Sequence, residues 1–281
     1  MYIYANDGTY KSNVNIYNIT QVCSYERNQF STEGTFMGVS GSLYLLIDTY
    51  FGEYLSTGPF MVFERDPIAT IKRVNANYIY SKEDGPLVKT YNPKSRGANV
   101  SLYVFHINHI IQENVFYSAS IISTIGGKIK IDYLYVDDVQ GYNSGLIYLE
   151  NNGVTIMRTS SFKNIYSKWP VPLFYANNNE FYYEPSFYIN EFTLSNVQED
   201  GVIFFINSCY IEVHHSLFEN IHECFLDNSC KSFSEELNDN FETSIIFFND
   251  INKQSNSTIN YCTFDHIYGS MNYDKKNILY I

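Results

Sequence analysis

The chain of 281 residues is short of proline, tryptophan and positive charge, with 7 Pro, 1 Trp and 18 Lys plus Arg against 30 Asp plus Glu. The net charge of −12 argues against nucleic-acid binding, which requires a basic surface, and disfavours docking on an anionic membrane. No window of about 18 apolar residues exists, so we expect no transmembrane helix. The first residues also lack the basic and apolar regions of a signal peptide.

Motifs of cofactor and metal chemistry are also missing. The five cysteines form no CxxC pair and no zinc-ligand spacing, and the sequence has no P-loop, dinucleotide-binding fingerprint or Gly-x-Ser-x-Gly elbow. Small buried thiols are the simpler interpretation of the cysteines, while Cys224 and Cys230 could bridge a short loop in an oxidising compartment. We therefore expect no cofactor and no metal, and we interpret His109 and His266 as structural residues.

Aromatic residues and asparagine are abundant instead. The chain contains 27 Tyr, 21 Phe and 31 Asn. Tyr and Phe favour pleated, half-buried strands, whereas Asn favours turns and left-handed backbone positions. This composition predicts an all-β protein with many turns.

A four-residue motif recurs along the chain, consisting of an apolar residue, any residue, then Asn, Asp, His or Gln, then Ile or Val. Its third position falls at residues 21, 49, 76, 109, 138, 164, 196, 220 and 266, of which 49 and 76 belong to weaker copies, and the mean step is near 31 residues. A second apolar run, exemplified by residues 146–149 and 202–205, keeps step with the motif, and a third short stretch lies between the two. Short strands at this period without helical periodicity are typical of a solenoid.

The repeat predicts a right-handed parallel β-helix of roughly nine rungs, with the motif at a tight bend in which Asn and Asp adopt left-handed backbone conformations. A β-sandwich is the competing fold, but its Asn-Gly or Asp-Gly turns would alternate with the strands, whereas here they punctuate the repeat. We expect one domain over residues 1–281. Both ends begin or end within a rung and lack a polar cap, so we expect this domain to be a fragment of a longer solenoid.

Catalytic constellations of β-helix enzymes are poorly represented. Asp137 and Asp138 resemble one hydrolase motif, and residues 127–130 faintly resemble another, but in the wrong order. Asp138 occupies the third position of the repeat motif, so a turn residue is the better interpretation. A lyase would require a carboxylate cluster for calcium and a nearby base, and basic residues are sparse.

The sequence resembles the β-helix repeats of anaerobic gut fungi, especially their scaffoldins. The resemblance is carried by the turns at residues 162–165 (Phe-Lys-Asn-Ile), 218–221 (Phe-Glu-Asn-Ile) and 264–267 (Phe-Asp-His-Ile), together with strands like residues 202–205. It implies a non-catalytic scaffold or cohesin-like module of a cellulosome, which binds enzyme-borne dockerins outside the cell or at its surface as part of a longer secreted protein. No binding residue of the family can be transferred.

We therefore expect a small dockerin-like protein partner, with polysaccharide as a further candidate ligand and with neither nucleic acid nor membrane insertion. The alternatives are a carbohydrate-active, pectate-lyase-like β-helix and an adhesin-like surface stalk. The candidate binding residues are Tyr182, Tyr183, Glu235 and Glu236, the last two within an acidic insertion over residues 226–243. The net charge of −12 favours a partner with a basic patch.

Overall fold

The computed structural model describes residues 3–5, 37–44, 49–55, 58–82, 84–91, 99–113, 118–141, 144–167, 172–178, 184–198, 202–222, 246–248 and 255–268. Within these ranges all regular secondary structure is β-strand, and no helix that could cross a membrane is found there. The strands are β1 (Ile3–Ala5), β2 (Met37–Tyr44), β3 (Thr49–Leu55), β4 (Met61–Ser81), β5 (Val88–Tyr91), β6 (Asn99–Gln112), β7 (Ser118–Ile125), β8 (Lys128–Gly141), β9 (Ser144–Glu150), β10 (Val154–Ser167), β11 (Phe174–Asn177), β12 (Phe187–Gln198), β13 (Phe204–Asn207), β14 (Tyr210–His214), β15 (Leu217–His222), β16 (Ile246–Phe248), β17 (Asn256–Asn260) and β18 (Thr263–Tyr268).

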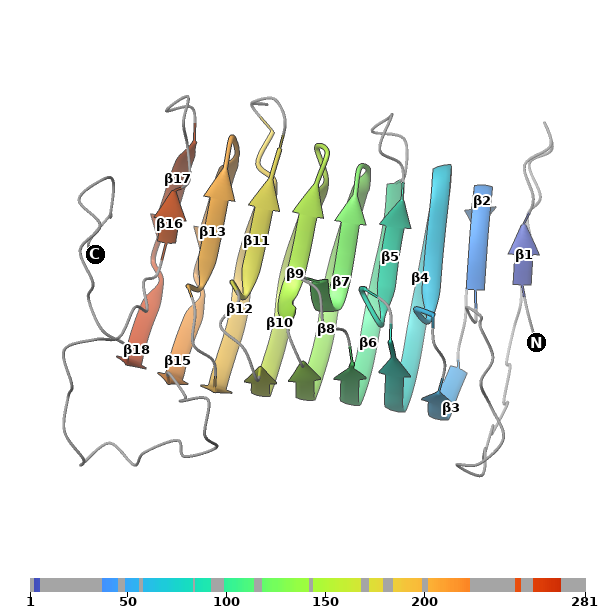
Figure 1. Ribbon diagram of the computed structural model, residues 1–281, viewed down its shortest axis with the longest axis horizontal. Coiled ribbons are helices and arrows are strands. Elements are labelled where there is room, and N and C mark those ends of the chain that lie inside the picture. The colour runs from blue at the N-terminus through green and yellow to red at the C-terminus, as the bar shows by residue number, and fades with distance from the viewer. Residues whose placement is uncertain are drawn as a thin grey trace.

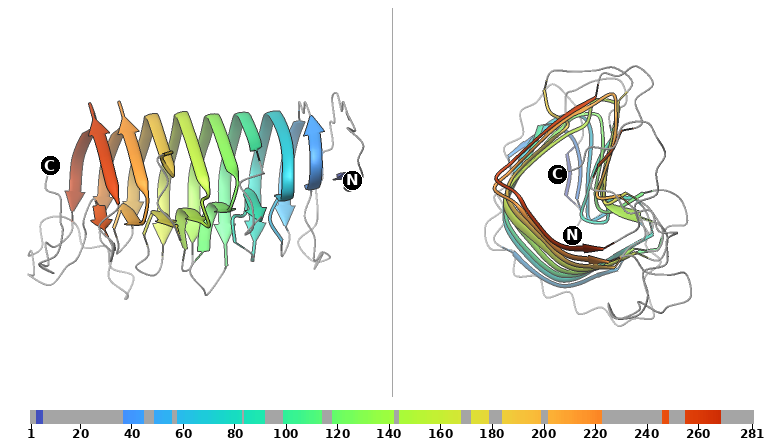
Figure 2. Two further views of the ribbon diagram at one scale, coloured as in Figure 1. Left: turned by 90° about the horizontal axis from the view of Figure 1, so that it is seen from above. Right: turned by 90° about the vertical axis from the view of Figure 1, so that its left-hand side faces the viewer.

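The strands build a parallel β-solenoid, which confirms the predicted all-β fold class (Figure 1). Each full turn contains one long strand and one short strand. The long strands β4, β6, β8, β10 and β12 pair in parallel with one another, and the short strands β5, β7, β9, β11 and β13 form a second parallel ladder. Seen end-on in Figure 2, successive turns overlie one another.

The predicted count of nine rungs is corrected to about four turns in the described part of the chain. The sequence count took every copy of the motif as a whole turn, including the copy at residue 21, which lies outside the described residues. A turn is complete only where the long and the short strand are both present. From β4 to β12 the chain passes four times from one long strand through a short strand to the next long strand.

The predicted corner ladder is confirmed. The strand registers place residues 138, 164, 196, 220 and 266 opposite one another in successive strands. Asn164, Asn196, Asn220 and His266 have φ between 52° and 57°, the left-handed conformation expected at a tight bend. Amide side chains also bond between turns: Asn196 donates to Asn164 at 3.0 Å, and Asn220 donates to Asn196 at 3.3 Å.

The weaker copies of the motif, at residues 76 and 49, were aligned two and four residues away from the observed corner. The register places Tyr78, not Ala76, opposite His109, and it places Glu53 opposite Tyr78. A shift of two residues keeps every side chain on the same face of a strand. The alternation of apolar and polar residues therefore could not detect the error.

A second left-handed corner bends the long strands near their middle, and the sequence did not predict it. It consists of Arg73, Val104, Tyr133, Thr159, Glu191, His215 and Tyr261, whose φ angles lie between 46° and 65°. None of these residues is Gly or Asn, and a β-branched residue in this region is sterically unfavourable. The flanking ladder bonds continue on both sides of the bend, for example from Lys72 opposite Tyr103 to Val74 opposite Phe105. The ladder therefore holds the backbone in a conformation that these side chains disfavour.

Serine hydroxyls bond the backbone directly after this second corner. Ser160 accepts a hydrogen bond from the Leu134 N–H at 3.1 Å and donates to the Arg158 carbonyl at 2.9 Å. Ser216 occupies the same place two turns on, where it accepts from the Phe192 N–H at 3.2 Å. Both serines are buried. Because a buried N–H without a partner is costly, the hydroxyl replaces the bond that the bend removes.

The core runs along the solenoid axis and is rich in phenylalanine. Phe174 stacks on Phe204 with ring centroids 5.0 Å apart, and Phe162 meets Phe192 edge-on at 5.1 Å. These four rings are essentially fully buried. Each such side chain contributes about 1.5–3 kcal/mol through burial, so the stacked rings are a main source of stability.

Replacing Asn220 with Leu is expected to lower the free energy of unfolding by about 1–2 kcal/mol, because Leu disfavours the left-handed backbone and cannot bond Asn196. Urea denaturation measures this change. Asn220→Gly tolerates the conformation and loses only the bond, so its loss should be smaller. A change of a few tenths for Asn220→Leu would contradict the structural role of this corner.

Replacing Val104 with Asn is expected to raise the free energy of unfolding by about 1 kcal/mol, because Asn tolerates the left-handed conformation that the β-branched Val side chain opposes. Val104→Thr is the matched control, since Thr remains β-branched and should bring no such gain. The two variants are compared with the parent by urea denaturation. If Val104→Thr raised the free energy of unfolding as much as Val104→Asn, the gain could not be attributed to the backbone conformation.

Candidate functional site

One outer face of the solenoid gathers basic and aromatic side chains from four successive long strands. It is formed by outward residues of β4, β6, β8 and β10 up to and including the second corner, which the register places side by side. We call this surface the basic face and define it by Lys72, Arg73, Tyr103, Lys128, Lys130, Tyr133 and Arg158. The segments that supply them are about 30 residues apart in the sequence, so only the stacking of turns brings them together.

Cations and rings contact each other on the basic face. The Lys72 ammonium lies 5.7 Å from the centroid of the Tyr103 ring, and the Arg158 guanidinium lies 5.8 Å from that of Tyr188 on β12. Tyr103 also meets Tyr133 edge-on, with ring centroids 5.4 Å apart. Cation–π contacts of this kind contribute about 0.5–1 kcal/mol at exposed sites. They order long side chains that would otherwise be free in solvent.

The basic face differs in charge from the protein as a whole. Among the residues whose side chains the structure describes, its outward positions on β4, β6, β8 and β10 carry five basic side chains and one carboxylate, Asp132, within a chain of net charge −12. Lys130 and Arg158 are exposed, and Tyr103 and the neighbouring Ile68 are 41% and 59% exposed. A locally positive, partly apolar surface of this kind is suited to a ligand that carries carboxylates.

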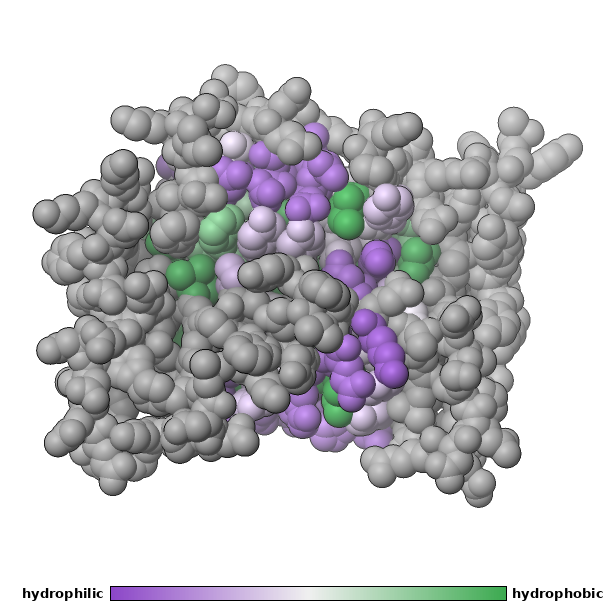
Figure 3. Space-filling view, in the orientation of Figure 1, coloured by the Kyte–Doolittle hydropathy of each residue, from purple (hydrophilic) through white to green (hydrophobic). Residues whose placement is uncertain are grey.

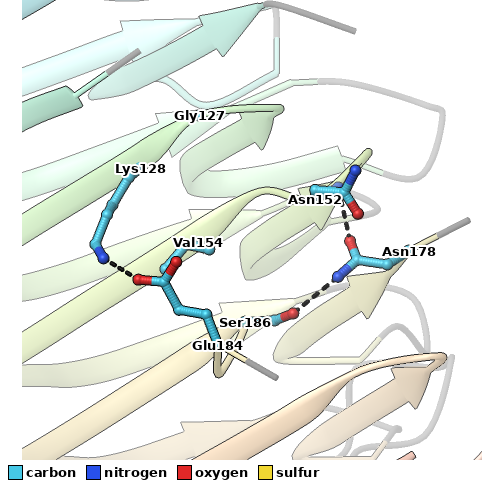
Figure 4. Close-up of a pocket in the computed structure, with 7 residues that line it drawn as sticks. All are labelled: Gly127, Lys128, Asn152, Val154, Asn178, Glu184 and Ser186. Atoms are coloured by element: carbon cyan, nitrogen blue, oxygen red, sulfur yellow. Dashed lines mark hydrogen bonds and ion pairs between the residues drawn. The ribbon is translucent and has the colours of Figure 1, made fainter. Parts of the chain in front are cut away.

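A small polar cavity lies beside the basic face, where the long strands begin (Figure 4). It has a volume of about 60 Å³ and is lined by Gly127, Lys128, Asn152, Val154, Asn178, Glu184 and Ser186. Its side chains are already bonded to one another: Lys128 pairs with Glu184, Asn178 accepts from the Asn152 N–H at 2.9 Å, and Asn178 donates to Ser186 at 2.9 Å. These bonds hold the lining side chains of the cavity in place.

Carboxylates and tyrosines meet on the ladder of short strands. Asp84 accepts hydrogen bonds from the Ala119 N–H at 2.6 Å and from the Ser123 hydroxyl. Burial raises the pKa of Asp84, and the charge of Glu150 adds to this rise, while the two hydrogen bonds and Lys89 oppose it. The group is thus held where its charged form is disfavoured despite good hydrogen bonds.

The next strands extend this group into an aromatic column. Tyr148 stacks on Tyr175 with ring centroids 4.7 Å apart, and Tyr175 stacks on Phe205 at 4.9 Å. Burial raises the pKa of Tyr148, and its hydrogen bond to Glu150 raises it further. The rings therefore stack mainly on each other between turns, and their hydroxyls remain protonated at neutral pH.

Figure 3 shows that hydrophilic residues predominate among those coloured on the face turned to the viewer of Figure 1, with small hydrophobic patches.

The Asp and His residues that were candidates for catalysis or metal binding bond or stack with side chains of neighbouring turns. Asp138 lies 3.0 Å from the His109 ring nitrogen, and Asp137 accepts from Asn164 at 3.1 Å. Ring stacking engages His106 with Tyr135 and His215 with Tyr261. Among the residues that the structure describes, no group of three or more His, Cys, Asp or Glu could hold a metal ion.

The candidate binding residues Tyr182, Tyr183, Glu235 and Glu236 lie outside the described residues, as does the insertion 226–243. The basic face was missed by sequence reasoning. Its residues have no common motif, and the overall acidity directed attention to carboxylates. The alternating pair Lys128 and Lys130 was the available signal, since residues two apart in a strand point to the same face.

Replacing Asp84 with Asn is expected to change the pH dependence of stability. The folded pKa of Asp84 lies above its usual value, so the folded state binds this proton more tightly than the unfolded chain. The parent should therefore gain stability relative to Asp84→Asn as the pH falls from 7 to 4. Urea denaturation of both proteins at several pH values measures the difference. A constant difference across this range would contradict the assigned direction.

Comparisons with known proteins leave the chain without a significant match to any protein-family model, curated protein or solved structure. The parallel solenoid therefore stands on the strand registers of the structure itself. The resemblance to scaffoldin repeats gains no support from these comparisons and remains an expectation from the sequence.

Proposed function

We propose that this solenoid is a non-catalytic binding module that receives a small, dockerin-like protein partner within an extracellular plant-cell-wall-degrading complex. The observation that carries the proposal is the basic face, where the exposed Tyr103 and Tyr133 lie within two strands of the exposed Arg158. Tyr and Arg are enriched among the residues that dominate binding energy at protein interfaces. The dockerin class and the extracellular setting come from the scaffoldin resemblance alone.

The architecture supports binding by a preformed surface. The basic face lies on strands whose neighbours are hydrogen-bonded in register on both sides, from β4 to β12. Side chains on such a ladder need little reordering when a partner binds, which lowers the entropic cost of association. The contacts of Tyr103 with Lys72 and Tyr133 restrict these side chains further.

A carbohydrate-active β-helix remains the second candidate, and one observation favours it. Asp84, in the segment before β5, bonds to β7 of the short-strand ladder, and Glu150 is the last residue of β9. The charge of Glu150 adds to the rise that burial causes in the pKa of Asp84. A carboxyl group with a raised pKa beside a second carboxylate is an arrangement used in glycoside hydrolysis. Asp84, however, is bonded to Ala119 and Ser123, which places it in the packing of the ladder.

Replacing Tyr103 with Ala is expected to weaken binding of a recombinant dockerin module about tenfold, through loss of an exposed ring at the centre of the basic face. Tyr166→Ala is the matched control, because Tyr166 is 36% exposed against 41% for Tyr103 but lies in the second half of β10, past the second corner. Isothermal titration calorimetry measures both affinities, and the control should bind like the parent.

Equal losses in the two tyrosine variants would contradict a site on the basic face. Absence of dockerin binding would contradict the proposed partner. Cleavage of pectin, xylan or cellulose by the purified protein, at a rate reduced by Asp84→Asn or Asp138→Asn, would replace the binding module by the carbohydrate-active enzyme.

A further inference from the structure

We propose that the basic face docks an acidic peptide segment, so that the partner presents carboxylates to this surface; this inference rests on the proposed binding function and names the chemistry of its partner. The net charge of −12 alone favours a partner with a basic patch. The distribution of charge leads to the opposite expectation for this one surface, because its cations are gathered on adjacent strands.

The cations that would bind the peptide are available on this face. Within the described part of the chain, the carboxylate of Glu184 pairs with Lys128, whereas neither Lys130 nor Arg158 lies within 4.0 Å of a carboxylate oxygen. Both side chains are exposed. An arginine guanidinium and a lysine ammonium both form charge-assisted hydrogen bonds with carboxylates. A carboxylate of the peptide that reaches Lys130 and Arg158 would therefore meet two donors, beside the Asp132 side chain that the register places opposite Arg158.

The spacing of the cations suits an extended chain. Lys72, Lys130 and Arg158 project from β4, β8 and β10, so they lie one or two turns apart along the solenoid, about 5–10 Å. Alternate side chains of an extended peptide lie about 7 Å apart on one face. A peptide lying along the solenoid axis with acidic residues at alternate positions can reach these cations in succession.

The aromatic rings favour a peptide over an acidic glycan. A sugar ring stacks on an open aromatic face, but the Tyr103 ring has the Lys72 ammonium over it and Tyr133 against its edge. The Tyr188 ring likewise has the Arg158 guanidinium over it. The rings thus hold the cations in place, and the ligand is recognised through its negative charge.

The negative charge of the rest of the protein favours binding of an acidic segment at the basic face over binding elsewhere on the surface. An acidic segment is repelled by the rest of the surface, which carries the excess of carboxylates. The basic face is therefore the region at which an acidic segment can approach closely. Like charges elsewhere act against binding in other positions and orientations.

The test uses the whole chain and a fluorescein-labelled peptide of about 12 residues with alternating Glu and Ser, followed by fluorescence anisotropy. The parent should bind the peptide, and binding should weaken as salt rises. The double variant Lys130→Gln with Arg158→Gln should bind about three- to tenfold more weakly. The matched control removes the same charge elsewhere, through Lys82→Gln with Lys163→Gln, both exposed residues outside the basic face. This control should bind like the parent, and thermal melting should show that both variants are folded.

Absence of peptide binding, or equal losses in the two double variants, would overturn the inference. Binding of polygalacturonate by a protein that does not bind the peptide would also overturn it and assign the face to an acidic glycan. Titration of the same variants with the dockerin module separates this inference from the proposed function. Dockerin binding that is unaffected by Lys130→Gln with Arg158→Gln would leave the function standing and remove the acidic docking surface.

Discussion

The backbone hydrogen-bond ladder between successive turns is the constraint on which the rest of this structure depends. Because parallel strands pair residue by residue, a bend in one turn must be matched by a bend at the same place in the next. The corner through Asn164, Asn196 and Asn220 and the corner through Val104, Tyr133 and Thr159 both follow this requirement. At the first corner the side chains suit the bend, whereas at the second the ladder imposes it. A cost of about 1–2 kcal/mol per residue is acceptable there because the surrounding strands leave no other conformation.

The ladder also determines which polar groups can be buried. A bend interrupts the regular bonding of the backbone, and the hydroxyls of Ser160 and Ser216 restore it from inside the core. Asp84 has a related role on the other ladder, where it accepts from the Ala119 N–H at a point of shifted register between β7 and β9. Its raised pKa is the consequence of satisfying that backbone group with a carboxylate in a site of low solvent access.

Repetition of the turn converts a linear pattern into a surface. Each of the four long strands supplies one to three of the side chains that define the basic face, and none of the strands would present a binding surface alone. Lys72 reaches Tyr103 on the next strand, and Arg158 reaches Tyr188 on the strand after its own. The proposed site is therefore a property of the stack. Its affinity for a partner depends on register as much as on the identity of the side chains.

The sequence by itself determined the all-β solenoid and the alignment of residues 138, 164, 196, 220 and 266, because Asn, Asp and His recur at one slot between apolar neighbours. It could not determine the number of complete turns, the alignment of Tyr78 with His109, or the second corner. A shift of two residues preserves the apolar pattern, and Val, Tyr, Thr and Glu carry no preference for a left-handed bend. Only the tertiary structure decided that Lys72, Lys130 and Arg158 share a face, since strands about 30 residues apart become neighbours through the ladder that pairs them.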